Sequence, residues 1–494
     1  MNTPSAREPP ALGAPARLVE IVRRLIWLYF ILWIIEGALR KWIVPQFSNP
    51  LLLVRDPVVV LIYLLSWRAG IFPRNWFIRS LLGIAVLSQI AGMIVLQPFL
   101  PPMKLLFVTL YGARSNFLHL PLIFVIGRVF DTAEVKRIGW WILVGMIPMT
   151  VLTALQFRAS PEAFINRTVG LGEAQQITAG GGKIRPPGTF SFVSGVIFYL
   201  SAATAFVLHG ALSRTTYKNS LLFAAGLAVV IGVAVSGSRS AVASVGLVVL
   251  SLFAILLIRP SAINRFGRSL LFAVILFWGL SYVPIFQEGV EILSARFTES
   301  AAAEEKTVAA GMFARIFSGF TEGLSVLDRL PLGGYGLGIG TNGGAKFLTG
   351  RATFLLAEGE WSRVLLESGP ILGLMFLLWR TTLTLYLGYL SVRSLARGET
   401  LAILLFSAGF FVIANGPFGQ PTSLGFAVVF GGLCLAATRS RGNAKEISPR
   451  PAEPSPGTHG GQRVRGRSVY ADRLHGPGAT QAKSNGSRDR RSSS

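Results

Sequence analysis

The sequence predicts an all-α, polytopic integral membrane helix bundle with about twelve transmembrane helices. Hydrophobic residues make up 51% of the 494-residue chain and charged residues only 14%, whereas a soluble globular protein carries about 25% charged residues. So few charges cannot cover the surface of a soluble protein that contains this much apolar side chain. The apolar residues also gather in long runs, and a helix that crosses a bilayer needs about 20 of them. The composition therefore argues against a disordered protein and against a soluble enzyme.

Twelve hydrophobic runs are the expected membrane helices, although several are shorter than a straight crossing requires. They span 20–39, 51–67, 78–99, 104–126, 138–156, 189–209, 220–237, 240–258, 269–286, 365–391, 400–415 and 418–438. Arg23 and Arg24 precede the apolar part of the first run, as basic residues do in a signal peptide. No small-residue cleavage pattern follows, so we expect an uncleaved first helix.

The distribution of lysine and arginine between the loops predicts that both chain ends lie in the cytoplasm. With a cytoplasmic N-terminus, seventeen of these residues fall in inner segments, and five fall in the short outer connections: Arg40, Lys41, Arg55, Lys104 and Arg239. Short cytoplasmic loops carry an excess of Lys and Arg, which favours this orientation, although the first outer loop is unusually basic. Two long segments, 157–188 and 287–364, then lie outside.

The chain divides into three parts by composition. Residues 1–19 form a short cytoplasmic segment, and residues 20–438 form the membrane-embedded domain. Residues 439–494 are rich in Pro, Gly, Ser and Arg, which predicts a disordered basic cytoplasmic tail. The formal net charge of +24 does not imply a nucleic-acid partner, because a basic tail beside a membrane is attracted to anionic lipid headgroups. We therefore expect membrane lipids, and no nucleic acid, among the partners.

Two stretches of the longer outer segment carry recognisable patterns. Apolar residues recur at helical spacing within 304–327, which predicts a helix that lies either in the membrane interface or over the bundle. The glycine-rich stretch 329–344 has neither the Lys-Ser nor the Lys-Thr of a P-loop and follows no expected strand. Its glycines are expected to allow tight turns and close backbone approach.

Charged residues gather at the expected outer ends of several helices. Arg185 precedes the sixth span and Arg239 lies in the turn before the eighth. A third group lies at the entrance of the tenth span and consists of Glu358, Glu360, Arg363 and Glu367. A charge beside a membrane helix is costly and needs a partner or a function. The three stretches predict a site at the outer leaflet, with Arg185 and Arg239 converging on one cavity.

Each of these charges also has a purely structural explanation. Arg185 and Arg239 can anchor helix ends at the membrane interface. The charges of 360–367 are spaced three and four apart, so they lie on one helical face and can pair with one another. Arg114 interrupts an expected membrane helix. It is either a functional charge or half of a buried pair whose partner the sequence does not name.

No metal site and no cofactor are expected. The chain has five Asp residues, none in an Asp-x-Asp pair, and its four His residues are scattered. A metal-dependent transferase of nucleotide sugars usually has such a pair, and a transition-metal site needs a cluster of ligands. The single cysteine, Cys434, excludes an intramolecular disulfide and a cysteine-based zinc site. Any chemistry is therefore expected to be metal-free, with arginine in the electrostatic role.

Four short stretches carry a resemblance to a known family through their order and spacing. They are IRPPGTFSF at 184–192, VSGSRSAVAS at 235–244, LPLGGYGLGIG at 330–340 and EWSRVLLESGPILGLMFLL at 360–378. Together they resemble the O-antigen ligase and O-antigen polymerase superfamily of bacterial envelope membrane proteins, closely over about 180–380. The resemblance implies a multi-pass protein of the bacterial inner membrane, with both termini inside and one large periplasmic loop.

The same resemblance implies a glycan transferase that works at the periplasmic face. Members of the superfamily take a glycan from an undecaprenyl-diphosphate carrier. Ligases pass it to lipid A-core, and polymerases pass it to another lipid-linked repeat unit. The family's arginines would fall on Arg185 and Arg239 as diphosphate binders, and Arg363 is a third candidate for a phosphate contact. The functional histidine of the ligases has no counterpart in AEGEW at 357–361, which favours a polymerase or a divergent exopolysaccharide transferase.

The residue types suit transfer without a metal. Fixed guanidinium groups can stabilise the charge that grows on a leaving diphosphate. The acceptor hydroxyl needs a base or an orienting acceptor, and Glu358 and Glu360 are the candidates. The alternatives are a flippase or exporter of lipid-linked oligosaccharides, and a non-catalytic assembly protein. A transporter would often show internal repeats and many deep ionisable residues, whereas only Arg114 and Arg380 are expected deep in the bundle.

Overall fold

Helices make up almost all of the structure, as the sequence predicts. The computed structural model describes residues 14–169, 176–213, 215–258, 279, 281–303, 319, 321–350 and 355–439. Within these ranges the only sheet is an antiparallel hairpin of β1 (Thr178–Gly180) and β2 (Lys183–Ile184). The predicted tail beyond residue 439 and most of the predicted helix 304–327 lie outside the described residues.

Six helical segments of the described part are long and apolar enough to cross a membrane. They are Pro45–Arg68, which includes α3 (Asp56–Arg68), and α4 (Trp76–Leu96), α7 (Thr132–Arg158), α8 (Val193–Leu212), α10 (Arg239–Ile258) and α15 (Glu360–Ala396). Three shorter apolar helices also fall on predicted spans: α9 (Asn219–Val235), α16 (Leu401–Asn415) and α17 (Pro421–Ala437). The prediction of an all-α fold is confirmed for the described residues, and six of its helical segments are candidate membrane spans by length and composition. The number of twelve stays a prediction, because the expected spans 20–39 and 104–126 are not among the candidates and 269–286 falls largely outside the described residues.

The first helix and several short elements complete the described part. α1 (Ala14–Ala38) runs directly into a π-helical turn, η1 (Leu39–Ile43). The other elements are η2 (Pro45–Phe47), α2 (Ser48–Leu51), α5 (Pro102–Ala113), η3 (Arg114–Leu118), α6 (Leu122–Val129), η4 (Phe164–Asn166), α12 (Pro284–Ala303), η6 (Leu327–Arg329) and α14 (Asn342–Thr349).

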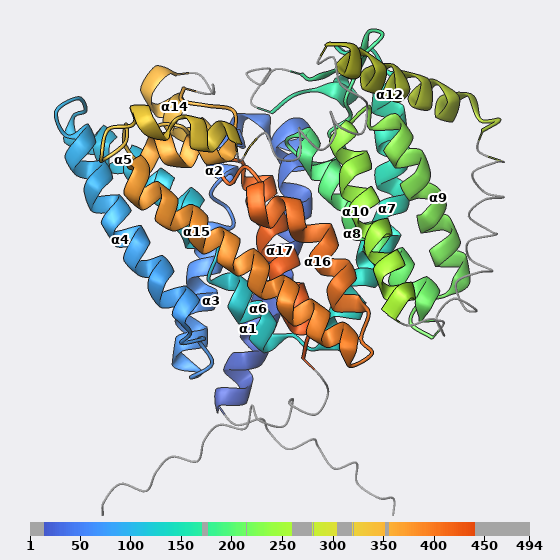
Figure 1. The fold of residues 1–494 in the computed structure, drawn as a ribbon, viewed down its shortest axis with the longest axis horizontal. Coiled ribbons are helices and arrows are strands. Elements are labelled where there is room, and N and C mark those ends of the chain that lie inside the picture. The colour runs from blue at the N-terminus through green and yellow to red at the C-terminus, as the bar shows by residue number, and fades with distance from the viewer. Residues whose placement is uncertain are drawn as a thin grey trace, which may run out of the picture. The chain divides into compact units, whose positions relative to one another are not determined.

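Among the described residues, the segments predicted as inner and outer loops lie at opposite ends of the bundle (Figure 1). At one end, where α1 begins and α17 ends, Arg439 donates to the carbonyl of Gly127 and Tyr217 donates to the carbonyl of Lys136. The opposite end carries the β1–β2 hairpin, α12 and α14, and we call it the hairpin end. This grouping agrees with the loops predicted from the charges. The side of the membrane that each end faces stays a prediction.

One of the predicted spans, 104–126, is broken. It forms α5, the π-helical η3 and α6, and a turn at 119–121 separates the last two. Arg114 and His119 are buried at this break, and both are bonded to Asp56. Backbone that leaves the helix at membrane depth is tolerated where protein covers it. The interruption therefore holds buried charge inside the bundle instead of forming one continuous crossing.

α15 is kinked at Gly369, where φ is +75°. Pro370 follows and has no N–H, so the carbonyl of Leu366 loses its helical donor. The backbone N–H of Tyr335 donates to that carbonyl at 2.7 Å, and the N–H of Gly336 donates to the next carbonyl along at 3.1 Å. The glycine-rich stretch thus makes the close backbone approach that its composition predicts.

The core of the bundle lies around α8, α16 and α17, which are buried on nearly every face. Glycines of α17 allow the close packing: Gly425 lies directly against Trp33 of α1, and Gly432 lies against Ile126 of α6. Small residues let helices approach closely in a membrane. The outer helices α3, α4 and α10 instead expose many large apolar side chains, as helices that face lipid do.

Candidate functional site

Arg185 lies beside the turn that precedes Arg239, at one junction of the hairpin end. Arg185 directly follows β2, and its backbone N–H donates to the carbonyl of Ile177 at 2.8 Å. Its side chain packs at the turn between α9 and α10, where its Cγ lies 3.9 Å from the position that a Cβ on Gly237 would occupy. Arg239 begins α10 two residues later, and both arginines are half-buried. The structure therefore places Arg185 beside the turn that leads into Arg239, although 54 positions separate them (239 − 185). The convergence of the two side chains on one cavity stays a prediction.

The helix α12 completes this junction. The Nη1 of Arg239 donates to the backbone carbonyl of Arg296 on α12 at 3.4 Å, and the Nη1 of Arg296 donates to a carbonyl of β1 at 3.0 Å. An ion pair of 3.0 Å between Lys183 and Glu288 also joins the hairpin to α12. The junction therefore collects basic side chains from the hairpin, α10 and α12.

The segment 185–191, which begins with Arg185, is held by Arg40 and Lys41 of η1. The carbonyl of Gly188 accepts a hydrogen bond from the buried ammonium of Lys41. The Nη1 of Arg40 donates to the hydroxyl of Ser191 at 3.0 Å. Gly188 has a φ of +58°, a conformation that favours glycine. The placement of the candidate diphosphate binder therefore depends on residues almost 150 positions earlier in the chain.

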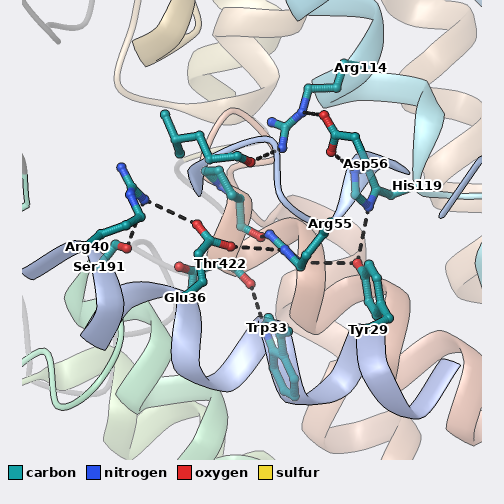
Figure 2. Close-up of polar contacts among 12 residues, drawn as sticks. Tyr29, Trp33, Glu36, Arg40, Arg55, Asp56, Arg114, His119, Ser191 and Thr422 are labelled. Carbon is teal, nitrogen blue, oxygen red and sulfur yellow. Dashed lines mark hydrogen bonds and ion pairs between the residues drawn. The ribbon is translucent and has the colours of Figure 1, made fainter. Parts of the chain in front are cut away.

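A network of buried charges lies behind this segment, and Figure 2 shows it. We call it the α1 network, and its members are Tyr29, Glu36, Arg40, Arg55, Asp56, Arg114 and His119. The carboxylate of Glu36 lies between two arginines, 3.3 Å from Nη1 of Arg40 and 3.0 Å from Nε of Arg55. Arg55 also donates to the hydroxyl of Tyr29 at 3.3 Å and to the carbonyl of Pro421 at 2.7 Å. Because Arg55 is completely buried, these bonds replace its contacts with water.

The other half of the α1 network gives Arg114 its partner. The Nε of Arg114 lies 2.7 Å from Oδ2 of Asp56, and its Nη2 donates to the carbonyl of Leu52 at 2.6 Å. The second oxygen of Asp56 lies 2.9 Å from Nε2 of His119, whose Nδ1 lies 3.3 Å from the Tyr29 hydroxyl (Figure 2). Arg114 is therefore half of a buried ion pair, and Asp56 is the partner that the sequence does not name.

The α1 network carries more positive than negative charge. Its three arginines face two carboxylates, which leaves one net positive charge when the histidine is counted as neutral. Burying a charge is costly unless an opposite charge or hydrogen bonds compensate it. The three basic residues predicted for the first outer loop, Arg40, Lys41 and Arg55, are thus buried inside the protein. A positive interior at the hairpin end favours an anionic ligand nearby.

None of the seven members of the α1 network is among the predicted site residues, and the sequence singles out only Arg114, as a functional charge or half of a buried pair. A usable signal is present in the sequence for two more. Glu36 and His119 each interrupt an apolar run, and an ionisable residue inside a membrane segment is a candidate functional residue by default. The pairing itself has no such signal, because the partners come from different helices.

A second buried network contains two of the predicted site residues. We call it the α15 network, and its members are Asn116, Glu360, Arg363, Glu367 and Arg380. Arg363 donates to both oxygens of Glu360 at 2.9 and 3.0 Å, to Glu367 at 2.7 Å and to Asn116 at 2.8 Å. Arg380 donates to Glu360 at 3.0 Å. Two arginines balance two carboxylates, and the pairing that the three- and four-residue spacing allows is present.

The two predicted catalytic carboxylates have different surroundings. Glu360 begins α15 and is only 4% exposed. Its oxygens accept hydrogen bonds from Arg363, Arg380 and the backbone N–H of Phe418. Glu358 lies in the loop before α15 and is exposed. Of the two carboxylates, Glu358 is the one with room for an incoming group. The catalytic roles of both stay predictions.

The α15 network is joined to the segment that carries Arg185. Phe418 bonds Glu360, and the side chain of Gln420 accepts from Ser194 at the start of α8 at 3.2 Å. α8 begins directly after the IRPPGTFSF stretch. The structure thus brings all three predicted charged stretches to the hairpin end, although Arg363 is engaged there by its own carboxylates.

The described residues contain no candidate metal centre. Among the residues that the structure describes, no group of three His, Cys, Asp or Glu side chains could hold a metal ion. The cysteine of α17, Cys434, is free and buried.

The resemblance to the O-antigen ligase and polymerase superfamily rests on the four short stretches and their order. A scan against protein-family models and a search of curated proteins each find no match to this chain.

Proposed function

We propose that this protein transfers a glycan from an undecaprenyl-diphosphate carrier to an acceptor at the periplasmic face of the bacterial inner membrane. The observation that carries the proposal is that Arg185 packs against the turn that precedes Arg239, and that Arg239 bonds α12. The diphosphate of the donor would bind there. Its lipid chain would lie along the apolar outer helices, so that the sugars stay outside the bilayer.

Arginine suits the bond that breaks in this reaction. The acceptor hydroxyl attacks the anomeric carbon, its proton passes to a base, and undecaprenyl diphosphate leaves with the bonding electron pair. Negative charge grows on the leaving group, and guanidinium groups can meet it with paired hydrogen bonds. Groups that are fixed before the reaction need no reorganisation during it. The hydrogen bonds that hold the segment 185–191 and Arg239 supply that fixation.

In this proposal Glu358 takes the proton of the acceptor hydroxyl, because it is the exposed carboxylate at the entrance of α15. Glu360 and Arg363 keep the start of α15 in place through their buried pairing. The stretch 357–361 lacks the histidine of the ligases. The proposed acceptor is therefore another lipid-linked repeat unit, as for a polymerase, in preference to lipid A-core, the acceptor of the ligases.

The test is transfer by the purified full-length protein in proteoliposomes. An undecaprenyl-diphosphate-linked oligosaccharide is the donor, with a second lipid-linked repeat unit or lipid A-core as acceptor, and mass spectrometry measures glycan length. We expect extension of the lipid-linked glycan, and we expect it to persist in EDTA. Loss of activity in EDTA that Mg²⁺ or Mn²⁺ restores would contradict the metal-free mechanism.

Variants of the two arginines test the site itself. Arg239→Ala should lower the transfer rate by about 10²–10³-fold, as loss of one preorganised donor does. Arg239→Lys should lower it less, because lysine keeps the charge but loses the planar fork. Arg393→Ala is the control, since Arg393 is exposed in the last turn of α15. That end of α15 lies away from the hairpin end (Figure 1). Full activity of both Arg185→Ala and Arg239→Ala would return the two residues to an anchoring role.

One observation favours a second function, the export or flipping of lipid-linked oligosaccharides. Buried charged side chains come from α1, η1, η3 and α15, and from Arg55 just before α3, whereas the sequence predicts only Arg114 and Arg380 deep in the bundle. Such residues mark substrate or proton pathways in transporters. A fluorescent lipid-linked oligosaccharide in liposomes separates the two functions. Its movement across the bilayer without any extension would favour export.

A further inference from the structure

One pocket near the hairpin end has no part in the proposed transfer. It lies between the residues that follow α1 and the segment that follows α7, and its volume is about 220 Å³. Its polar lining consists of Lys41, Glu162, Arg167, Thr168 and Gln176. Pockets that hold drug-sized ligands measure about 300–1,000 Å³. This pocket therefore fits one small chemical group and not an oligosaccharide.

Lys41 is the unusual member of this lining. Its side chain is 1% exposed, its ammonium donates to the carbonyl of Gly188, and it lies 4.3 Å from the ring centroid of Trp42. Burial lowers the pKa of Lys41 to about 7, and no carboxylate in the described part of the chain raises it again. A buried ammonium with one backbone acceptor and no carboxylate partner is costly, and an anion in the pocket would remove that cost.

The rest of the lining fits an anion with polar substituents. Arg167 adds a second cation at the exposed rim, where its guanidinium lies 5.4 Å from the ring centroid of Phe164. Glu162 is also exposed at the rim, so the lining holds two positive charges and one negative charge. Thr168 and Gln176 add hydrogen-bonding groups. The NH₂ group of Gln176 is held by two backbone carbonyls at 2.7 and 2.8 Å.

We propose that this pocket binds a single anionic group, a phosphate or a carboxylate carried by a lipid headgroup or by a sugar. Lys41 is the buried anchor and Arg167 is the contact at the rim. Because Lys41 also bonds Gly188, the bound group sits directly behind the segment 185–191. The proposal concerns binding alone, so it holds or fails independently of glycan transfer.

Sulfate is a suitable probe because its charge does not change between pH 6 and 9. The full-length protein is placed in nanodiscs of neutral phosphatidylcholine, and its thermal unfolding midpoint is measured against sulfate at constant ionic strength. A ligand that binds only the native state raises this midpoint. We expect stabilisation at pH 6, where Lys41 is protonated. Above about pH 7 the free Lys41 amine is mostly neutral, so an anion can bind its ammonium form only if the amine takes up a proton. The stabilisation by sulfate should therefore fall as the pH rises beyond about 7.

Three variants locate the response. Lys41→Met should weaken sulfate binding at least about tenfold, since a charge-assisted hydrogen bond contributes about 1.5–3 kcal/mol, and it should remove the pH dependence. Arg167→Ala leaves the bond to Gly188 intact and should weaken binding several-fold without loss of fold. Lys104→Met, at an exposed lysine of α5, should change nothing. Equal sulfate affinity of the wild type, Lys41→Met and Arg167→Ala would overturn the proposal.

Two further arms identify the source of the group. If a lipid headgroup fills the pocket, the wild-type protein should already have a raised unfolding midpoint in nanodiscs that contain anionic phosphatidylglycerol. Added sulfate should then raise it no further. If an acidic sugar fills it, glucuronate should stabilise the protein in neutral nanodiscs more strongly than sulfate does. Glu162→Gln should strengthen binding in either case, because it removes the negative charge at the rim. An unchanged midpoint with every anion, in the wild type and at pH 6, would refute the pocket as an anion site.

Discussion

The α15 network and the α1 network both bury arginines against carboxylates, but they are built differently. Four of the five members of the α15 network lie on one helix, and its charges balance. The α1 network joins three parts of the chain, namely α1 with the η1 turn that continues it, residues 55–56 and the broken span around η3, and it keeps one excess positive charge. A balanced network needs no further partner. An unbalanced one at the same end of the bundle favours a negative ligand.

The two networks also act on different neighbours. The α15 network bonds the loop between α16 and α17 through Phe418 and Gly416. The α1 network bonds Ser191 and, through the adjacent Lys41, Gly188. The α15 network therefore holds a helix and a loop together, while the α1 network, which also bonds Pro421 at the start of α17, holds the segment that positions Arg185. We therefore expect that disruption of the α15 network lowers the stability of the protein, and that disruption of the α1 network lowers both its stability and its activity.

The largest expected effect is all-or-none and tests whether the hairpin end, where both networks lie, faces the periplasm. Ser294→Cys places a thiol on exposed α12, and it should react with a membrane-impermeant maleimide applied to intact spheroplasts. Arg393→Cys should react only after permeabilisation. Cys434 is buried, so the background should be low. Labelling of Ser294→Cys only after permeabilisation would reverse the orientation and remove both networks from the proposed site.

The next effect is on stability and concerns the balanced network. Glu360→Gln leaves Arg363 and Arg380 without a shared carboxylate partner. Breaking one side of a buried ion pair costs about 3–5 kcal/mol, so we expect a much lower unfolding midpoint in denaturant titrations. Glu358→Gln is the matched control, two residues earlier and exposed, and should stay within about 0.5 kcal/mol of the wild type. Equal midpoints for the two variants would mean that the network does not hold α15.

The smallest effect concerns the link between the two halves of the α1 network. Tyr29→Phe keeps the ring but removes the hydroxyl that lies 3.3 Å from both Arg55 and His119. Loss of such a hydrogen bond costs about 0.5–1.5 kcal/mol, measurable by the same titration. Tyr389→Phe, at an exposed tyrosine of α15, should cost nothing measurable. A cost for Tyr29→Phe as large as that for Glu360→Gln would show that the two networks do not differ in the way described.

Several features of this protein follow from the sequence by itself. Apolar runs predict helices because a backbone in lipid must satisfy its own hydrogen bonds, and nearly all the expected spans in the described part are helical. The spacing of 360–367 predicts the pairing in the α15 network, since residues three and four apart share one helical face. The glycines of 329–344 predict close backbone approach, and Tyr335 makes it at Leu366. All of these are local rules.

Tertiary structure alone decides the rest. Arg114 finds Asp56 across 58 positions and Arg55 finds Glu36 across 19, and no spacing rule predicts either pair. Which face a helix turns toward its neighbour depends on how all the helices pack, and only that packing brings these charges within bonding distance. The break at 119–121 has the same origin, because buried partners compensate for the interrupted helix. The sequence determines that charges must be paired inside the bundle, and the packing of the helices determines which ones pair.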